Sequence, residues 1–135
     1  MRGQDVFLDG IKMTYPNGFT AVHETDLTIN AGEFFSILGP SGCGKTTILR
    51  MISGFLDPTA GAISIGGVRM NGIGPNQRPT ALIFQNLALF PLMPVWENVA
   101  FGLEARGVPK AKRRKRAEEL LELVALYGQA DKMPT

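Results

Sequence analysis

The stretch G-P-S-G-C-G-K-T at Gly39–Thr46 matches the pattern G-x-x-x-x-G-K-[ST] at every fixed position. Glycines let the backbone curl so that successive N–H groups point inward at an anion. A helix that follows such a loop turns its free N–H groups and positive dipole end toward the same anion. The stretch therefore predicts a loop that binds phosphate groups, and a glycine-rich turn that matches by chance is the alternative.

The flanking sequence supplies the context that such a loop requires. The apolar run Glu33–Leu38 is typical of a strand buried on both faces of a parallel sheet. Lys45–Ser53 has helical spacing of apolar residues, and Gly54 suits the end of that helix. Strand, glycine loop and helix in this order favour the phosphate-binding interpretation. Thr80–Phe84 is predicted as a second short apolar strand.

Four side chains near the loop are candidates for chemistry. Lys45 adds a full positive charge near the β and γ phosphates of a nucleotide, and the Thr46 hydroxyl is placed to bind Mg²⁺. Gln85 directly follows the second predicted strand, where functional groups of open α/β sheets gather. Its amide either reaches the metal ion or an attacking water, or bonds the loop backbone. Tyr15 either stacks on a base or is a packed or surface aromatic.

Composition sets the broad class of the protein. Apolar residues make up 44% and charged residues 19% of 135 residues, as in an ordinary globular domain or part of one. The single cysteine, Cys43, allows no internal disulfide, and we interpret it as a small loop residue rather than a reactive thiol. No apolar run reaches the roughly 20 residues of a membrane span, so we expect a soluble, cytoplasmic protein.

The rest of the chain alternates strand, turn and helix signals. Strands are expected at Val6–Tyr15 and Thr20–Ile29, a hairpin at Ala62–Ile65 and Val68–Met70, and helices at Val95–Arg106 and about 109–126. Lys110–Arg116 holds six of the fourteen basic residues. The pairs Arg114 with Glu118 and Lys115 with Glu119 favour a solvated helix face over a site for nucleic acid or lipid head groups, so no nucleic-acid partner is expected.

Four segments together resemble the nucleotide-binding subunits of ABC transporters. They are L-G-P-S-G-C-G-K-T-T at Leu38–Thr47, I-F-Q ending at Gln85, L-A-L-F at Leu87–Phe90 and E-N-V-A-F-G-L at Glu97–Leu103. The sequences of these segments are most similar to those of importers of the polyamines spermidine and putrescine. Importers of iron(III), sugars and sulfate have nearly the same sequences at these segments. The resemblance implies an α/β P-loop NTPase fold. Residues 1–135 would then form its N-terminal part: an antiparallel β subdomain, the P-loop strand and helix, and the start of a helical subdomain.

The resemblance also implies roles for individual residues. Tyr15 matches the aromatic that stacks on adenine, Lys45 and Gln85 match catalytic positions, and Thr46 and Gln85 match Mg²⁺ ligands. The segment Asn86–Trp96 matches the surface that receives the transmembrane permease subunits, with Pro94 and Leu92 as departures from the usual wording. The residues matching the ATP-binding loop are Gly39, Pro40, Ser41, Gly42, Cys43, Gly44, Lys45, Thr46 and Thr47.

Further partners and limits follow from the same resemblance. It implies a dimer with a second copy of the ATPase subunit, an indirect partnership with a solute-binding protein, and a peripheral location on the inner face of the cell membrane. The sequence to Thr135 holds no L-S-G-G-Q, no later strand ending in Asp-Glu and no switch histidine. We therefore expect this chain to bind ATP weakly and to hydrolyse essentially none.

Two other functions are alternatives to an importer ATPase. A truncated nucleotide-binding module without turnover is one alternative. A small-molecule kinase is disfavoured because L-A-L-F and E-N-V-A-F-G-L have no reason to occur in it.

Overall fold

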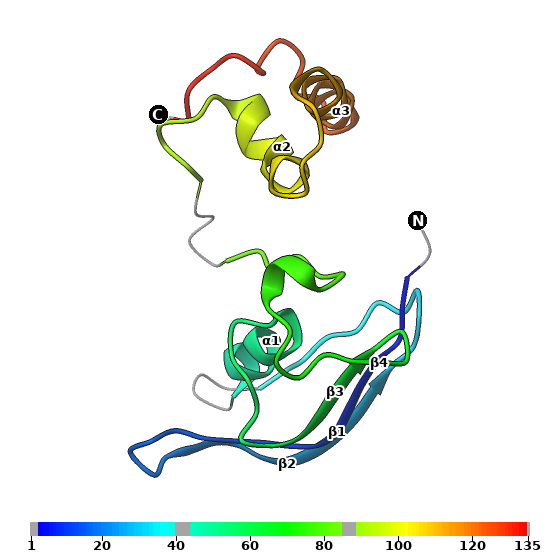
Figure 1. The fold of residues 1–135 in the computed structure, drawn as a ribbon, viewed down its shortest axis with the longest axis vertical. Helices are drawn as coiled ribbons and strands as arrows, with labels where there is room; N and C mark the ends of the chain where they lie inside the picture. Colours follow the sequence, from blue (N-terminus) through cyan, green and yellow to red (C-terminus); the bar gives the residue numbers. More distant parts are fainter. Residues whose placement is uncertain (1–2, 40–43, 85–88, 135) are drawn as a thin grey trace. The chain divides into compact units, whose positions relative to one another are not determined.

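The computed structural model describes residues 3–39, 44–84 and 89–134. Its internal contacts divide the chain into two units, Met1–Leu82 and Ile83–Thr135, which are described separately. Figure 1 shows a sheet with a helix beside it in the first unit and a pair of helices in the second.

A four-stranded antiparallel sheet forms the first unit, in the order β2-β1-β3-β4. Its strands are β1 (Val6–Thr14), β2 (Thr20–Ile29), β3 (Ala60–Ile65) and β4 (Val68–Arg69). The turn between β1 and β2 is closed by a bond from the Gly18 N–H to the Tyr15 carbonyl at 2.9 Å. These elements confirm the predicted pair of long strands and the short hairpin.

Strand β1 keeps its apolar residues on one face by means of a bulge. Leu8 lies opposite Leu27 and Ile11 opposite Thr25, and the register shifts between the two pairs. In a regular strand residues 8 and 11 would lie on opposite faces. Because the bulge inserts an extra residue, Leu8 and Ile11 are both fully buried.

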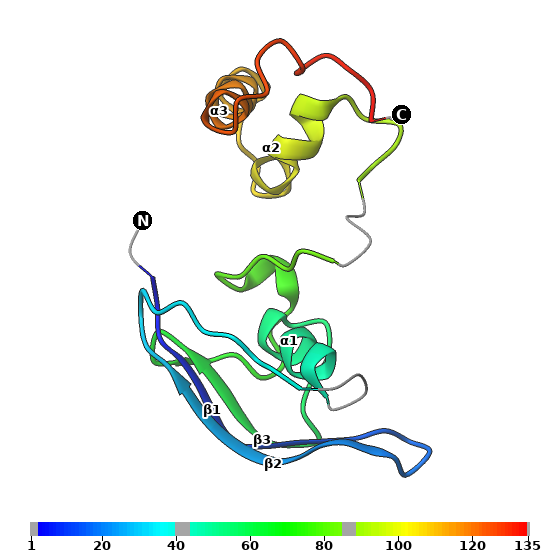
Figure 2. The same ribbon diagram turned by 180° about the vertical axis from the view of Figure 1, so that it is seen from behind.

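Helix α1 (Lys45–Ser53) packs on the sheet and completes the core of the first unit, as both ribbon views show (Figures 1 and 2). It begins and ends where the apolar spacing and Gly54 predicted. Met51 is the side chain of α1 that is fully enclosed. The buried core residues are Leu8, Ile11, Met13, Val22, Met51 and Ile63.

Two predicted strands do not form. Glu33–Leu38 and Thr80–Phe84 contain no strand, and Phe34, Leu38 and Ile83 are 95%, 90% and 83% exposed. A strand exists through a ladder of hydrogen bonds to a neighbour. Neither segment belongs to the four-stranded sheet. The prediction of these two strands is therefore wrong for this structure, because an apolar run does not say which neighbour provides the ladder.

The second unit is built from helices α2 (Val95–Ala105) and α3 (Lys110–Leu123), which confirm the two predicted helices. Trp96, Ala100 and Ala117 form its buried core. The segment after α3 returns to the start of α2, where the Val95 N–H donates to the Lys132 carbonyl at 2.8 Å and the Trp96 N–H to the Ala130 carbonyl at 2.9 Å. Among the described residues, no helix has the length and apolar character needed to cross a membrane.

Arg114 joins three parts of the second unit. Its guanidinium donates to both Asp131 carboxylate oxygens at 2.7 and 3.1 Å and to Glu118 Oε1 at 2.8 Å. It also lies 5.1 Å from the centre of the Trp96 ring. The hydrogen bonds that Arg114 donates to Asp131, and then that to Glu118, raise the pKa of Arg114, and the bonds that Asp131 accepts from Arg114 lower the pKa of Asp131.

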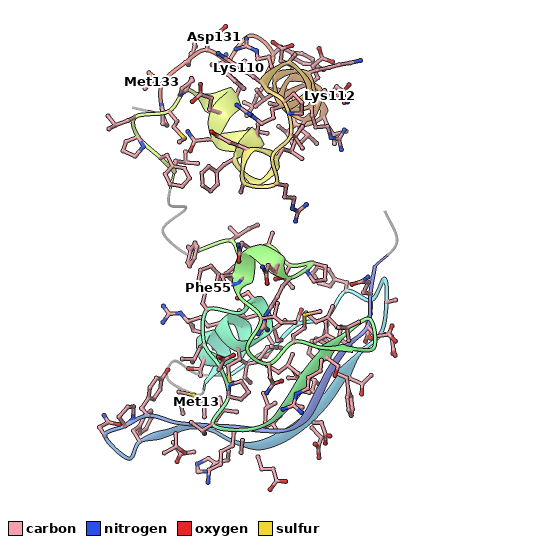
Figure 3. All side chains as sticks on the ribbon, in the orientation of Figure 1. Met13, Phe55, Lys110, Lys112, Asp131 and Met133 are labelled. Carbon is pink, nitrogen blue, oxygen red and sulfur yellow. The ribbon has the colours of Figure 1, made fainter. Side chains whose placement is uncertain are left out.

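The other charges of α3 follow the predicted solvated face, with one correction. The expected pair of Arg114 with Glu118 is present, but Glu119 accepts from Arg116 at 3.2 Å rather than from Lys115. Residues three and four apart on a helix are both neighbours, so either spacing provides a partner. Lys110 and Lys112, labelled in Figure 3, are exposed.

The Arg114–Asp131 pair predicts an acid-sensitive second unit. The folded-state pKa of Asp131 is lowered from its usual value of 3.8, so its contribution is present above pH 3.8 and is lost as the pH falls through the lower folded-state value. We expect Asp131→Asn to lower the unfolding midpoint slightly at pH 7, with the difference vanishing in strong acid. The fluorescence of Trp96, the single tryptophan, reports this unfolding.

The matched control for that experiment is Glu119→Gln. It removes an exposed pair within α3 that reaches no other segment. A midpoint that changes equally in both variants would contradict the special role of Asp131.

Candidate functional site

The start of α1 is a helix end without a side-chain cap. Gly44 is its N-cap residue with φ of 91°, and no acidic residue lies in the first turn. The helix continues by a bond from the Ile48 N–H to the Gly44 carbonyl at 2.9 Å. An α-helix leaves its first N–H groups without intrahelical acceptors and carries positive potential at this end. The first turn of α1 is therefore suited to an anion.

Gly44 also fits the helix start closely against β2. A Cβ atom at this position would lie 2.6 Å from the Ala21 carbonyl oxygen and 3.1 Å from Val22 Cγ2. Its left-handed backbone is one that residues other than glycine adopt only at a cost. Two constraints thus require glycine here, and both are independent of any bound phosphate.

Lys45 and Gly39 come together across the loop. The Lys45 Nζ donates a hydrogen bond to the Gly39 carbonyl oxygen, so the two described ends of the loop are joined by the lysine side chain. Thr46 is exposed, and Thr47 is half-buried. The structure thus places Gly39, Lys45 and the first turn of α1 at one site.

Five other predicted site residues lie outside the described residues, and Tyr15 packs against the core of the first unit. Pro40, Ser41, Gly42, Cys43 and Gln85 belong to the ranges that are not described. Tyr15 follows the end of β1, is half-buried, and packs against the core cluster of the first unit. Its Tyr15 N–H donates to the Phe19 carbonyl at 2.8 Å. A role of Tyr15 in stacking on adenine stays a prediction.

The described residues at the loop fit a divalent cation only when phosphate oxygens supply most of its ligands. Among the described residues, no group of three His, Cys, Asp or Glu side chains gathers to hold a metal ion. Thr46 presents an exposed hydroxyl in the first turn of α1. Mg²⁺ commonly keeps several waters and takes few protein ligands together with phosphate oxygens. The Thr46 hydroxyl is compatible with that way of binding.

The segment Asn86–Trp96, which is predicted to receive the permease subunits, exposes apolar side chains in its described part, residues 89–96. Leu89 is 61% and Leu92 is 90% exposed. A groove of about 410 Å³ lies within the second unit beside this segment. It is lined chiefly by Leu89, Val95, Val99, Leu120, Leu121, Val124 and Leu126. Exposed apolar surface of this kind is typical of a contact surface for another protein.

Asn98 is a residue whose structural role the sequence reasoning missed. Its carboxamide accepts from the Phe90 N–H at 2.8 Å and donates to the carbonyls of Phe90, Met93 and Pro94 at 3.1, 3.0 and 3.3 Å. It therefore fixes the backbone that presents the exposed leucines. Its place in E-N-V-A-F-G-L was the signal available, but that wording does not reveal which backbone groups the amide would meet.

Comparisons with known proteins agree on one family. The family model described as ABC transporter matches residues 22–135. The chain is 50% identical to the spermidine/putrescine import ATP-binding protein of Thermobifida fusca, with 96% of this chain and 34% of the relative covered. It is 44% identical to the sn-glycerol-3-phosphate import ATP-binding protein of Chromohalobacter salexigens, with 94% and 34% covered. The chain thus spans about a third of the length of these relatives.

A solved structure supports the same conclusion. The ATP-binding cassette MJ0796, in a dimeric post-hydrolysis state bound to ADP and Pi, is similar with a TM-score of 0.82 and 32% identity. The match covers 96% of this chain and 61% of that one. The likeness confirms the predicted fold class.

The close approach at Gly44 predicts a strong effect of adding one methyl group. Gly44→Ala should lower the free energy of unfolding by about 1–3 kcal/mol or more, because backbone strain and a clash with Ala21 act together. Urea unfolding followed by circular dichroism measures this. Gly32→Ala is the control, since Gly32 has φ of 76° and a Cβ there meets nothing within 4 Å. Equal losses in the two variants would contradict a steric role for Ala21.

Proposed function

We propose that this chain, which belongs to the ABC transporter family, binds Mg-ATP at the start of α1 and forms the nucleotide-binding part of an importer subunit. The observation that carries this proposal is the meeting of Lys45 with Gly39 at an uncapped helix end. The two units would be parts of one ATP-binding domain that continues beyond residues 1–135.

The described residues suggest how the phosphates are held. First-turn N–H groups of α1 supply donors of fixed direction, and the helix dipole favours negative charge at this end. Lys45, whose ammonium group already reaches across the loop, supplies a full charge to the β and γ phosphates. Gly39–Thr47 would enclose them, and Tyr15 would stack on the adenine ring.

Mg²⁺ and the hydrolysis step place further demands on the chain. Thr46 and Gln85 would hold the metal ion, which would neutralise charge that develops on the phosphates. Lys45 would hold the transferring phosphate, and Gln85 would orient the attacking water. A stabilised transition state needs more groups than these. We therefore propose that hydrolysis depends on residues outside this chain, and that the chain alone is a binding module.

The transported solute is proposed from the relatives. Those named as spermidine/putrescine importers are 50–55% identical, against 42–44% for those named as sn-glycerol-3-phosphate importers. A polyamine is therefore the proposed solute, with iron(III), sugar or sulfate as alternatives. Uptake of labelled putrescine by cells with and without the intact gene tests this choice, and unchanged uptake would contradict it.

The proposed partners follow from the family and from the second unit. Transmembrane permease subunits would dock on Asn86–Trp96, where Leu89 and Leu92 are exposed. A second copy would complete the ATP site, and a solute-binding protein would act through the permease. The protein would then lie on the cytoplasmic face of the membrane without crossing it.

Removing the loop lysine should weaken nucleotide binding. Lys45→Ala deletes a charged donor worth about 1.5–3 kcal/mol, so the dissociation constant for Mg-ATP should rise about 10–100-fold. Isothermal titration calorimetry measures both constants. Lys110→Ala, at an exposed position on α3, is the control and should leave the constant unchanged. Equal affinity of wild type and Lys45→Ala would argue against the proposed site.

Hydrolysis by the chain alone should be absent. Incubation with Mg-ATP and measurement of phosphate release should give the same background rate for the wild-type chain and for Lys45→Ala. Sustained release by the wild type above this variant would show that the missing groups are not required.

A further inference from the structure

Arg78 is an unusual residue in the first unit. It is 1% exposed, and among the described residues it is the one charged side chain that is buried. Removing a guanidinium from water is costly unless its donors are satisfied. Burial lowers the pKa of Arg78, while the nearby Asp57 carboxylate raises it. A buried cation outside the phosphate loop requires a structural reason.

Four hydrogen bonds to backbone carbonyls hold the Arg78 guanidinium. Nε donates to the Ile73 carbonyl at 2.8 Å and Nη2 to the Met70 carbonyl at 2.8 Å. Nη1 donates to the carbonyls of Met51 and Ile52 at 2.9 and 3.1 Å. Nη2 also lies 3.9 Å from Asp57 Oδ1, which forms an ion pair with it. The group is thus held by fixed backbone acceptors.

These acceptors belong to two different parts of the first unit. Met51 and Ile52 lie in the last turn of α1, whereas Met70 and Ile73 belong to the chain that follows β4. The planar guanidinium therefore connects the C-terminal end of α1 to that chain. A cation at this end also complements the helix dipole.

Gly54 leaves room for this connection. A Cβ atom on Gly54 would lie 2.7 Å from Arg78 Nε and 3.0 Å from Arg78 Cδ. The end of α1 and the guanidinium are therefore in close contact. The position of one restricts the position of the other.

The contacts of Arg78 differ in kind from the others that hold α1. A nine-residue helix is too short to be stable alone, so its orientation comes from tertiary contacts. The contacts of Met51 in the core are apolar and non-directional. Hydrogen bonds from a planar guanidinium have fixed directions. Arg78 thus restrains rotation and sliding of α1 in a way that apolar packing does not.

We propose that Arg78 is a positioning residue, which holds α1 so that Lys45 and Thr46 at its opposite end meet a triphosphate correctly. This inference rests on the proposed binding of nucleotide at α1. It assigns to Arg78 an effect on affinity beyond its contribution to stability.

The test measures Mg-ATP affinity and unfolding of the full chain with substitutions at Arg78 and, as a control, at Ser53. Arg78→Met removes all donors, and Arg78→Lys keeps the charge but not the planar fork. Both should raise the dissociation constant, by roughly five- to tenfold for Met as is typical of coupled sites, and by less for Lys. Titrations are run at a temperature where circular dichroism shows the variants folded.

Ser53→Ala is the matched control for stability. It removes the bonds from Ser53 Oγ to the carbonyls of Leu49 and Arg50 at 2.8 and 3.3 Å, in the same last turn of α1, but leaves Arg78 in place. This variant should unfold more easily and bind Mg-ATP as tightly as the wild type. If Ser53→Ala loses as much affinity as the Arg78 variants, Arg78 acts through stability alone and the inference fails.

Hydrogen exchange on the wild type keeps the test decisive if Arg78→Met does not fold. Coupling between two sites is reciprocal, so Mg-ATP should slow amide exchange in residues 70–78 and in the last turn of α1. Unchanged exchange there, or unchanged affinity in Arg78→Lys, would overturn the inference. A wild-type chain that binds no Mg-ATP would instead overturn the proposed function itself.

Discussion

Helix α1 is too short to keep its shape in water, and the candidate site depends on the contacts that hold it against the sheet. Gly44 fits its start against Ala21, Met51 fills the core at its middle, and Arg78 binds its last carbonyls. Each contact restrains a different motion. A helix end can bind phosphate well only when its direction is fixed. The candidate site therefore depends on the packing of the core of the first unit.

In the second unit, polar side chains hold the irregular segments in place. Asn98 binds the backbone of the segment before α2, and Arg114 joins α3 to the segment after it. Apolar side chains such as Leu92 are consequently exposed on a backbone that is held in place. A surface of this kind offers a partner a preformed shape, so binding costs less conformational entropy.

The sequence predicted the elements that have a local signal. Strands β1 and β2, the short hairpin and the three helices follow from alternation, helical spacing and turn glycines. The loop pattern also identified Gly39, Gly44 and Lys45, which the structure brings together. The prediction of strands at Glu33–Leu38 and Thr80–Phe84 was wrong. A strand needs a hydrogen-bonded neighbour, and a local sequence pattern holds no information about that neighbour.

Arg78 and Asn98 escaped sequence reasoning for a related reason. Both side chains bind backbone carbonyls, and any residue type provides a carbonyl. No spacing of residue types marks such an acceptor, and in the case of Arg78 the acceptors in α1 are distant in the chain. The amino-acid type indicated a capacity to donate, while the fold alone decided where the donors point.

The return of the chain to the start of α2 has a consequence for synthesis on the ribosome. The N–H groups of Val95 and Trp96 find their acceptors at Lys132 and Ala130, which are synthesised after both α2 and α3. At ordinary translation rates, a delay of roughly seconds separates the synthesis of the start of α2 from the synthesis of its two acceptor residues. During that interval these two N–H groups at the start of α2 lack the acceptors that they have in the folded chain.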